Sequence, residues 1–122
     1  MGYLDLYRAF EEEGVEKAIE GWKLFADMPE VWIACHYDSE VILPIREFIA
    51  RKGVDDRVKQ EDIAVFKKAL EVKADPYYFE EGEEYPLSHW WFYLDRISER
   101  TYPAELLPEY LSEIYLKVLH ES

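Results

Sequence analysis

The amino-acid sequence predicts an all-α protein, a compact bundle of about five or six helices. Apolar side chains recur every three or four residues along most of the chain, which is the period of an amphipathic helix. Apolar residues make up 49% of the 122 residues, enough to build a packed core. The stretch 31–37 is the one candidate strand, and no other segment has the alternating pattern needed to pair with it. We therefore expect one helical domain over residues 1–122.

Two helices are expected in the first quarter of the chain. Residues 3–13 carry four aromatic or apolar side chains at helical spacing, and Gly14 follows where a left-handed cap would end the helix. The next helix is expected over residues 15–26, where the same spacing is repeated by Val15, Ala18, Ile19, Trp22, Phe25 and Ala26. Pro29 then ends the pattern, because a residue before proline resists the α region.

The assignment is less direct between residues 29 and 53. Residues 31–37 are apolar on both faces and fit a buried strand or a buried helix. We favour a helix, since Pro29 suits a first helical position. Residues 41–49 are periodic again, and Gly53 is the expected stop. Pro44 lies inside this pattern and costs about 3 kcal/mol in a helix interior, so a break or bend is expected near residues 39–44.

A charged connection over residues 54–59 leads to a further expected helix over residues 60–73, which Asp75-Pro76 ends. The following segment, residues 75–86, holds two prolines, a glycine and three consecutive rings, and we expect an ordered loop there.

A helix is expected from Pro86 or Ser88 through Ile97. It carries rings at four consecutive positions, 90–93, so it should be surrounded by other parts of the protein. Residues 104–107 form at most a turn. Pro108 then opens a last helix that ends near Leu119.

The charge balance excludes several classes of function. The chain carries 27 acidic and 14 basic side chains, a net charge of −13, and such a surface repels a phosphate backbone and anionic lipid. The longest apolar run, residues 31–35, is too short to span a bilayer, and no N-terminal signal-peptide pattern is present. The single cysteine, Cys35, excludes an intrachain disulfide. We expect a cytoplasmic protein that binds neither nucleic acid directly nor a membrane.

The polar residues also predict a thermophilic source. The chain has no Asn, one Gln and one Thr, against 19 Glu. Surfaces built from charged groups in place of thermolabile amides are typical of thermophiles.

Aromatic and acidic side chains between residues 77 and 91 form the predicted partner-binding surface. Adjacent residues on a helix point about 100° apart, so one of Trp90 and Trp91 is expected to face outward or into an interface, which also predicts self-association as a homodimer. Dense negative charge beside rings can hold a basic peptide or a cation. The predicted surface consists of Trp90, Trp91, Tyr77, Tyr78, Glu80, Glu81, Glu83 and Glu84.

A second set of residues offers metal ligands. His36, Asp38 and Glu40 lie within five positions, and His36 and Glu40 share a face of a helix. With His89 they form the candidate metal site, although the chain lacks a motif with two closely spaced His ligands. Cys35 is a poor candidate nucleophile, because His36 points in a different direction and burial in an apolar run raises the pKa of a thiol.

The leading interpretation is a non-catalytic protein–protein interaction module that uses no cofactor and whose partner is another protein or a second copy of the chain. The first alternative is a small metal-binding protein or metal-assisted hydrolase that uses His36, Asp38 and Glu40. The second is an acidic imitation of nucleic acid. No Gly-rich phosphate loop and no nucleophile elbow is present, so no nucleotide cofactor and no catalytic residue are assigned.

Overall fold

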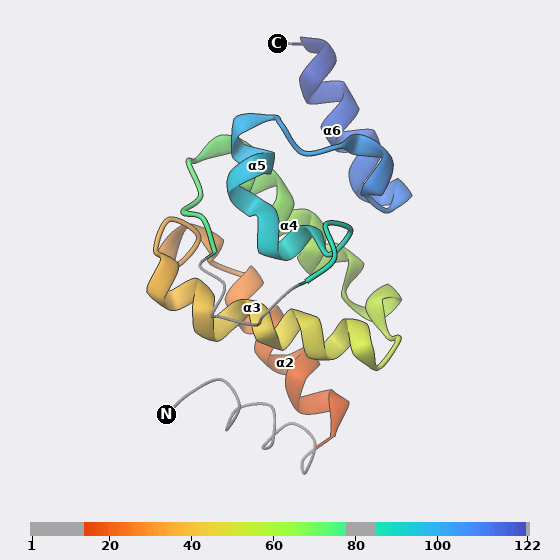
Figure 1. Cartoon of the computed structure of the whole chain (residues 1–122). Coiled ribbons are helices and arrows are strands. Elements are labelled where there is room, and N and C mark those ends of the chain that lie inside the picture. The colour runs from red at the N-terminus through yellow and green to blue at the C-terminus, as the bar shows by residue number, and fades with distance from the viewer. Residues whose placement is uncertain (1–13, 78–84, 122) are drawn as a thin grey trace.

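The computed structural model describes residues 14–77 and 85–121, and all regular secondary structure in this part of the chain is helical (Figure 1). The all-α fold class is therefore confirmed. The α-helices are α2 (Val15–Ala26), α3 (His36–Arg51), α4 (Lys59–Glu71), α5 (Leu94–Glu99) and α6 (Glu109–Glu121). Short 3-10 turns are η1 (Pro29–Val31), η2 (Asp55–Val58), η3 (Trp90–Tyr93) and η4 (Ala104–Leu106). The helix expected over residues 3–13 and most of the loop expected over residues 75–86 lie outside the described residues.

Helix α4 is the central element of this arrangement. It packs against α2, α5 and α6, and α3 packs across α2 (Figure 1). Aromatic side chains fill the space between the helices: the ring of Phe66 on α4 meets Trp90 at 6.0 Å and Tyr115 at 5.9 Å between centroids, in both cases edge to face. Such contacts are a preferred geometry for ring pairs. Through the ring of Phe66, the core thus links α4 to η3 and to α6.

The predicted bounds of three helices are confirmed to within two residues. Helix α2 covers the predicted range 15–26, α4 begins one residue before the predicted range 60–73 and ends two residues before its end, and α6 starts directly after Pro108. All three are amphipathic segments with one apolar face, for which the spacing of apolar residues is the strongest local signal.

Of the break or bend expected near residues 39–44, the break is wrong. Helix α3 is continuous from His36 to Arg51 with Pro44 inside it, and the interruption falls earlier, at residues 32–35 between η1 and α3. Residues 42–49 are all buried, so this part of α3 is enclosed by the fold. Burial of one large apolar side chain contributes about 1.5–3 kcal/mol, and several such side chains together outweigh the cost of one proline. The helix favoured for residues 31–37 is found only as η1 and the start of α3.

The end of α3 at Gly53 is confirmed, and its geometry explains the residue. Gly53 has a φ of +71°, a left-handed conformation that suits glycine. Its N–H donates to the carbonyl of Ala50 at 3.0 Å, and the N–H of Val54 donates to that of Ile49 at 3.4 Å. These two bonds satisfy carbonyls that the end of the helix leaves free.

The aromatic segment is split into η3 and α5 instead of forming one helix. The expectation that it is surrounded is confirmed, but the expectation that one indole faces outward is wrong, because Trp90 is 1% and Trp91 4% exposed. A 3-10 turn points successive side chains about 120° apart, and each direction is covered: Trp90 by Phe66, Trp91 by Arg46 and His89, and Phe92 by Tyr77 and Tyr85.

Candidate functional site

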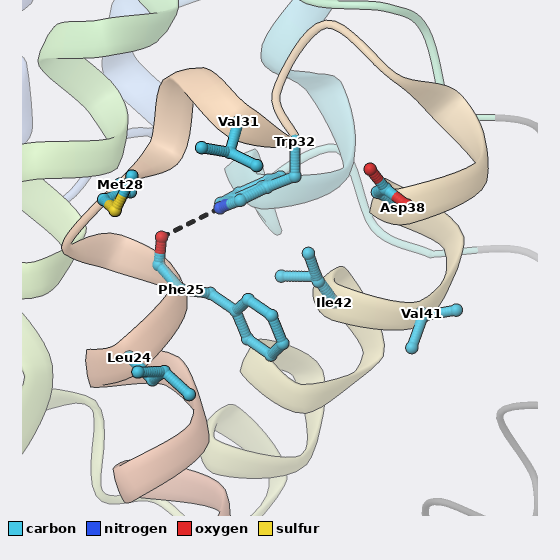
Figure 2. A pocket seen from close by; sticks show the side chains of 8 residues that line it. All are labelled: Leu24, Phe25, Met28, Val31, Trp32, Asp38, Val41 and Ile42. Carbon is cyan, nitrogen blue, oxygen red and sulfur yellow. Dashed lines mark hydrogen bonds between the residues drawn. The ribbon is translucent and has the colours of Figure 1, made fainter.

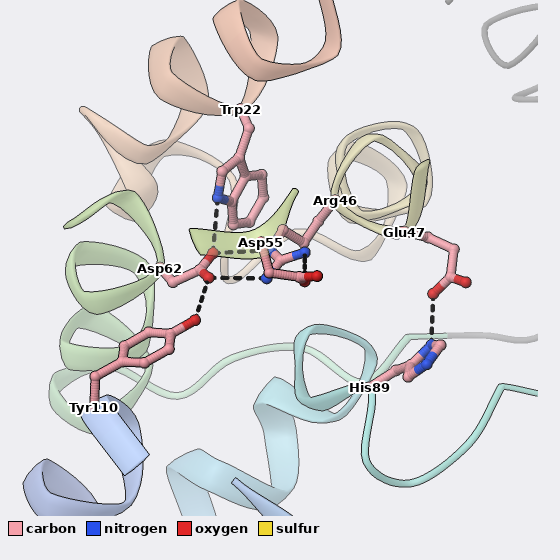
Figure 3. Close-up of polar contacts among 7 residues, drawn as sticks. All are labelled: Trp22, Arg46, Glu47, Asp55, Asp62, His89 and Tyr110. Carbon is pink, nitrogen blue, oxygen red and sulfur yellow. Dashed lines mark hydrogen bonds and ion pairs between the residues drawn. The ribbon is translucent and has the colours of Figure 1, made fainter. Parts of the chain in front are cut away.

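A buried ion pair joins α3 to α4 (Figure 3). The guanidinium of Arg46 donates from Nε to Asp62 Oδ1 at 2.8 Å and from Nη2 to Asp62 Oδ2 at 2.9 Å. Both side chains are fully enclosed. Arginine and carboxylate groups match in this two-pronged geometry, which offsets part of the free-energy cost of removing both charges from water.

Two further donors complete the hydrogen bonding of Asp62. The indole Nε1 of Trp22 donates to Oδ1 at 3.0 Å, and the hydroxyl of Tyr110 donates to Oδ2 at 2.7 Å. Burial raises the pKa of Asp62, and the bonds from Arg46, Tyr110 and Trp22 act in the opposite direction. Burial and the charge of Asp62 also raise the pKa of Tyr110 far above its ordinary value. These residues, called the polar network below together with Arg46, connect α2, α3, α4 and α6.

A cavity of about 450 Å³ lies beside the polar network. Arg46 and Asp55 both line it, and Nη1 of Arg46 is 2.7 Å from Asp55 Oδ1, an ion pair without the angles of a hydrogen bond. The guanidinium also lies over the ring of Trp91 at 4.4 Å, and the ammonium of Lys59 lies 5.6 Å from the centroid of the Tyr110 ring. The cations that line this cavity are therefore already held by groups of the protein itself.

The ring of His89 lines the same cavity and is also paired. Its Nδ1 is 2.7 Å from Oε1 of Glu47, which is buried and whose other oxygen accepts from Arg51 Nε at 3.0 Å (Figure 3). The imidazole stacks on Trp91 with 4.8 Å between centroids. Glu47 was not among the predicted site residues. Its only sequence signal is the spacing of four to Arg51, and spacing carries no information on His89, 42 positions away.

The structure does not bring the predicted metal ligands together among the side chains it describes. No group of three His, Cys, Asp or Glu suitable for a metal ion occurs in the described residues. Asp38 lies nine residues before Glu47 on α3, about 13 Å along the helix axis at 1.5 Å per residue, so it is separated from His89. The side chain of His36 lies outside the described part, and the metal hypothesis stays a prediction. Cys35, expected to be buried, is a free thiol that is only half-buried at the start of α3.

An apolar groove lies between the end of α2 and the start of α3 (Figure 2). Its volume is about 360 Å³, and its lining residues are Leu24, Phe25, Met28, Val31, Trp32, Asp38, Val41 and Ile42. Four of these are large apolar side chains that remain exposed: Leu24 by 71%, Val31 by 62%, Met28 by 54% and Val41 by 52%. Among the described residues two other large apolar side chains are exposed, Leu106 by 37% and Leu116 by 52%. Most of the exposed large apolar side chains in the described part of the chain therefore gather at one place.

The floor of the groove is held by Trp32. Its indole Nε1 donates to the carbonyl of Phe25 at 2.8 Å, which ties η1 back to α2 (Figure 2). Its ring packs against Trp22 with 6.1 Å between centroids. Because Trp22 in turn donates to Asp62, the floor of the groove is linked to the polar network through Trp22.

The described residues of the predicted partner-binding surface are not exposed. Trp90, Trp91 and Tyr77 are buried, and Tyr78, Glu80, Glu81, Glu83 and Glu84 lie outside the described residues. Sequence reasoning missed the groove, although Leu24 and Met28 carried a signal. They are apolar but fall outside the apolar positions that define the core face of α2, a placement that leaves them without a partner in the core.

Comparisons of the chain with protein-family models, with curated proteins and with solved structures find no match. Within the described residues, no helix has both the length and the apolar character that crossing a bilayer requires.

Proposed function

We propose that this protein is a non-catalytic interaction module that binds another protein through the groove between α2 and α3. The observation that carries this proposal is the convergence of Leu24, Met28, Val31 and Val41, all more than half exposed, on one groove. Large apolar side chains on a protein surface are ordinary when scattered singly, whereas a contiguous group marks an interaction site.

The groove supports this function better than the cavity beside the polar network does. In the cavity, Arg46 and His89 are engaged by Asp62, Asp55 and Glu47. A ligand there would have to displace buried or tethered partners. In the groove, the exposed side chains can be covered without breaking any hydrogen bond, so each Å² of apolar surface removed from water contributes about 25 cal/mol against the entropy cost of association.

The test is to select binders from a displayed library of helical peptides and measure their affinity for two variants. Val41→Asp places a charge in the groove, and Leu116→Asp places one on α6 at a position of the same 52% exposure. Val41→Asp should weaken binding at least about tenfold, since an apolar contact is lost and a carboxylate is desolvated, and about 1.4 kcal/mol corresponds to tenfold. Leu116→Asp should leave affinity unchanged.

The proposal fails if no peptide binds the intact chain, or if the selected peptides bind both variants equally. Circular dichroism of both variants verifies that they are folded, so that a loss of binding reflects the groove and not unfolding.

A further inference from the structure

We infer that the partner segment is an amphipathic helix whose apolar face enters the groove and whose flanking residues are Lys or Arg. This inference rests on the proposed function and specifies the chemistry of the partner.

The backbone of the groove favours a helix over an extended segment. An extended peptide gains affinity by hydrogen bonding to the free edge of a sheet. The groove walls are α2, η1 and α3, and the described residues contain no strand. An extended segment would therefore find no edge to pair with, whereas a helix satisfies its own backbone groups and presents only side chains.

One wall of the groove carries a helix ridge. Asp38 and Val41 are three residues apart on α3, while Leu24 on α2 and Met28, just after the end of α2, line the other wall. Side chains at a spacing of three or four form a ridge that fits between the side-chain rows of a packed helix. A partner helix would meet them with apolar residues at positions i, i+3 or i+4, and i+7.

Charge selects the kind of helix. The chain between Leu24 and Ile42 holds four acidic residues, Asp27, Glu30, Asp38 and Glu40, and no Lys or Arg. The first three are exposed. Lys68 of α4, which interacts electrostatically with Glu30, is itself bonded to Glu71 at 2.8 Å.

A partner with basic residues around its apolar face would therefore meet a surface on which acidic residues outnumber basic ones. A second copy of the chain would instead bring another net charge of −13 against it. Exposed ion pairs contribute little affinity each, but complementary charge accelerates encounter and rejects wrong partners. Apolar burial thus supplies most of the affinity and charge supplies the selectivity.

The experiment compares two fluorescently labelled helical peptides of about 18 residues, five turns at 3.6 residues each. Both carry the same leucines at i, i+3, i+4 and i+7, and their flanking positions are Lys in one and Glu in the other. Binding to the full chain is measured by anisotropy at about 50 mM and about 500 mM salt, because high salt screens exposed charges. The basic peptide should bind at least about tenfold tighter at low salt, with the ratio shrinking at high salt.

Two triple variants test whether the acidic residues beside the groove produce the preference for the basic peptide. The triple variant Asp27→Asn, Glu30→Gln, Asp38→Asn removes three acids beside the groove, and the control Glu109→Gln, Glu113→Gln, Glu121→Gln removes three exposed acids from α6. The first should reduce the preference for the basic peptide, and the second should leave it nearly unchanged. Equal reduction by both would overturn the inference, because selectivity would then come from net charge alone.

The outcomes separate this inference from the proposed function. If both peptides bind equally, or the acidic one binds tighter, and both lose affinity for Val41→Asp, the charge assignment is wrong and the groove function stands. If neither peptide binds and sedimentation shows that Val41→Asp dissociates a dimer of the intact chain, the occupant is a second copy and the inference is overturned. If neither binds and the chain is monomeric, both the inference and the function fail.

Discussion

The polar network and the groove lie along the same helix, but their side chains are distributed in opposite ways. In the second half of α3, Arg46 is fully buried and meets Asp62 in the interior. In the first half, Val41 is half exposed beside an apolar groove. In the network the side-chain groups of Asp62 and most of those of Arg46 have partners within the protein, whereas the groove leaves apolar surface in contact with water.

This difference assigns different roles to the two regions. Removing one partner from the polar network leaves the other charge buried and unpaired, so the network is needed for the stability of the fold. The four exposed side chains of the groove contribute little to folding, because they remain largely exposed in the folded state. A feature that costs solubility without adding stability is better explained by binding, which is why the groove, and not the more polar cavity, is the candidate interaction site.

The largest effect on stability is expected from breaking the ion pair. Arg46→Ala should lower the free energy of unfolding by about 3–5 kcal/mol, since Asp62 would be left buried without its charge partner. Urea denaturation monitored by tryptophan fluorescence measures this. The double variant Arg46→Met, Asp62→Leu should lose less than either single variant, because no charge stays buried. A single variant that loses under about 1 kcal/mol would show that the pair is not as enclosed as the structure has it.

A smaller loss is expected for Tyr110→Phe, which removes one of the four hydrogen bonds to Asp62 and keeps the ring. Hydrogen bonds to charged groups contribute about 1.5–3 kcal/mol, and the same denaturation experiment applies. If Tyr110 acts through the polar network, Tyr110→Phe should lower the free energy of unfolding by less in a chain that already carries Arg46→Met, Asp62→Leu. An equal loss in both chains would show that Tyr110 does not act through the network.

Alkaline pH tests the network in another way. Burial raises the pKa of Tyr102 and of Tyr110 far above the ordinary value of 10. Below pH about 10 neither the folded nor the unfolded chain is ionised at these positions, and above it only the unfolded chain loses the protons. Stability should therefore fall as pH rises, by up to about 1.4 kcal/mol per tyrosine for each pH unit. Tyr110→Phe should make this decline shallower; an unchanged slope would contradict the raised pKa of Tyr110.

The smallest effect on stability is expected in the groove. Leu24→Gln and Val31→Gln should change the free energy of unfolding by no more than about 0.5 kcal/mol, as exposed substitutions commonly do. The same variants should weaken binding of apolar helical peptides, measured by anisotropy. A loss of more than about 2 kcal/mol of stability would instead place these side chains in the core and remove the contrast between the two regions.

Local sequence patterns predicted the helices and helix ends that depend only on neighbouring residues. The apolar spacing of residues 15–26 and the position of Pro108 each located a helix, and Gly53 located an end, since spacing and backbone freedom are properties of a few consecutive residues. The same reasoning failed at Pro44. Its cost is local and visible in the sequence, but the burial that outweighs it comes from elements elsewhere in the chain.

The sequence singled out some residues of the candidate site but not the residues that they contact. His89 was singled out as a residue able to bind a metal, yet its partner Glu47 lies 42 positions away. Trp90 and Trp91 were predicted as anchors for a partner from their 100° separation on a helix, but a 3-10 turn and side chains from α3 and α4 cover both.

What the sequence by itself determined is the helical class and the location of most helices, because the period of apolar residues and the turn-forming residues act over a few positions. What only the tertiary structure decided is which apolar side chains remain uncovered and which charges meet. Arg46 and Asp62 are 16 positions apart, and Leu24 and Val41 are 17 apart, on helices that only tertiary packing brings together. Exposure and pairing depend on that packing, which involves all the helices at once and no single segment.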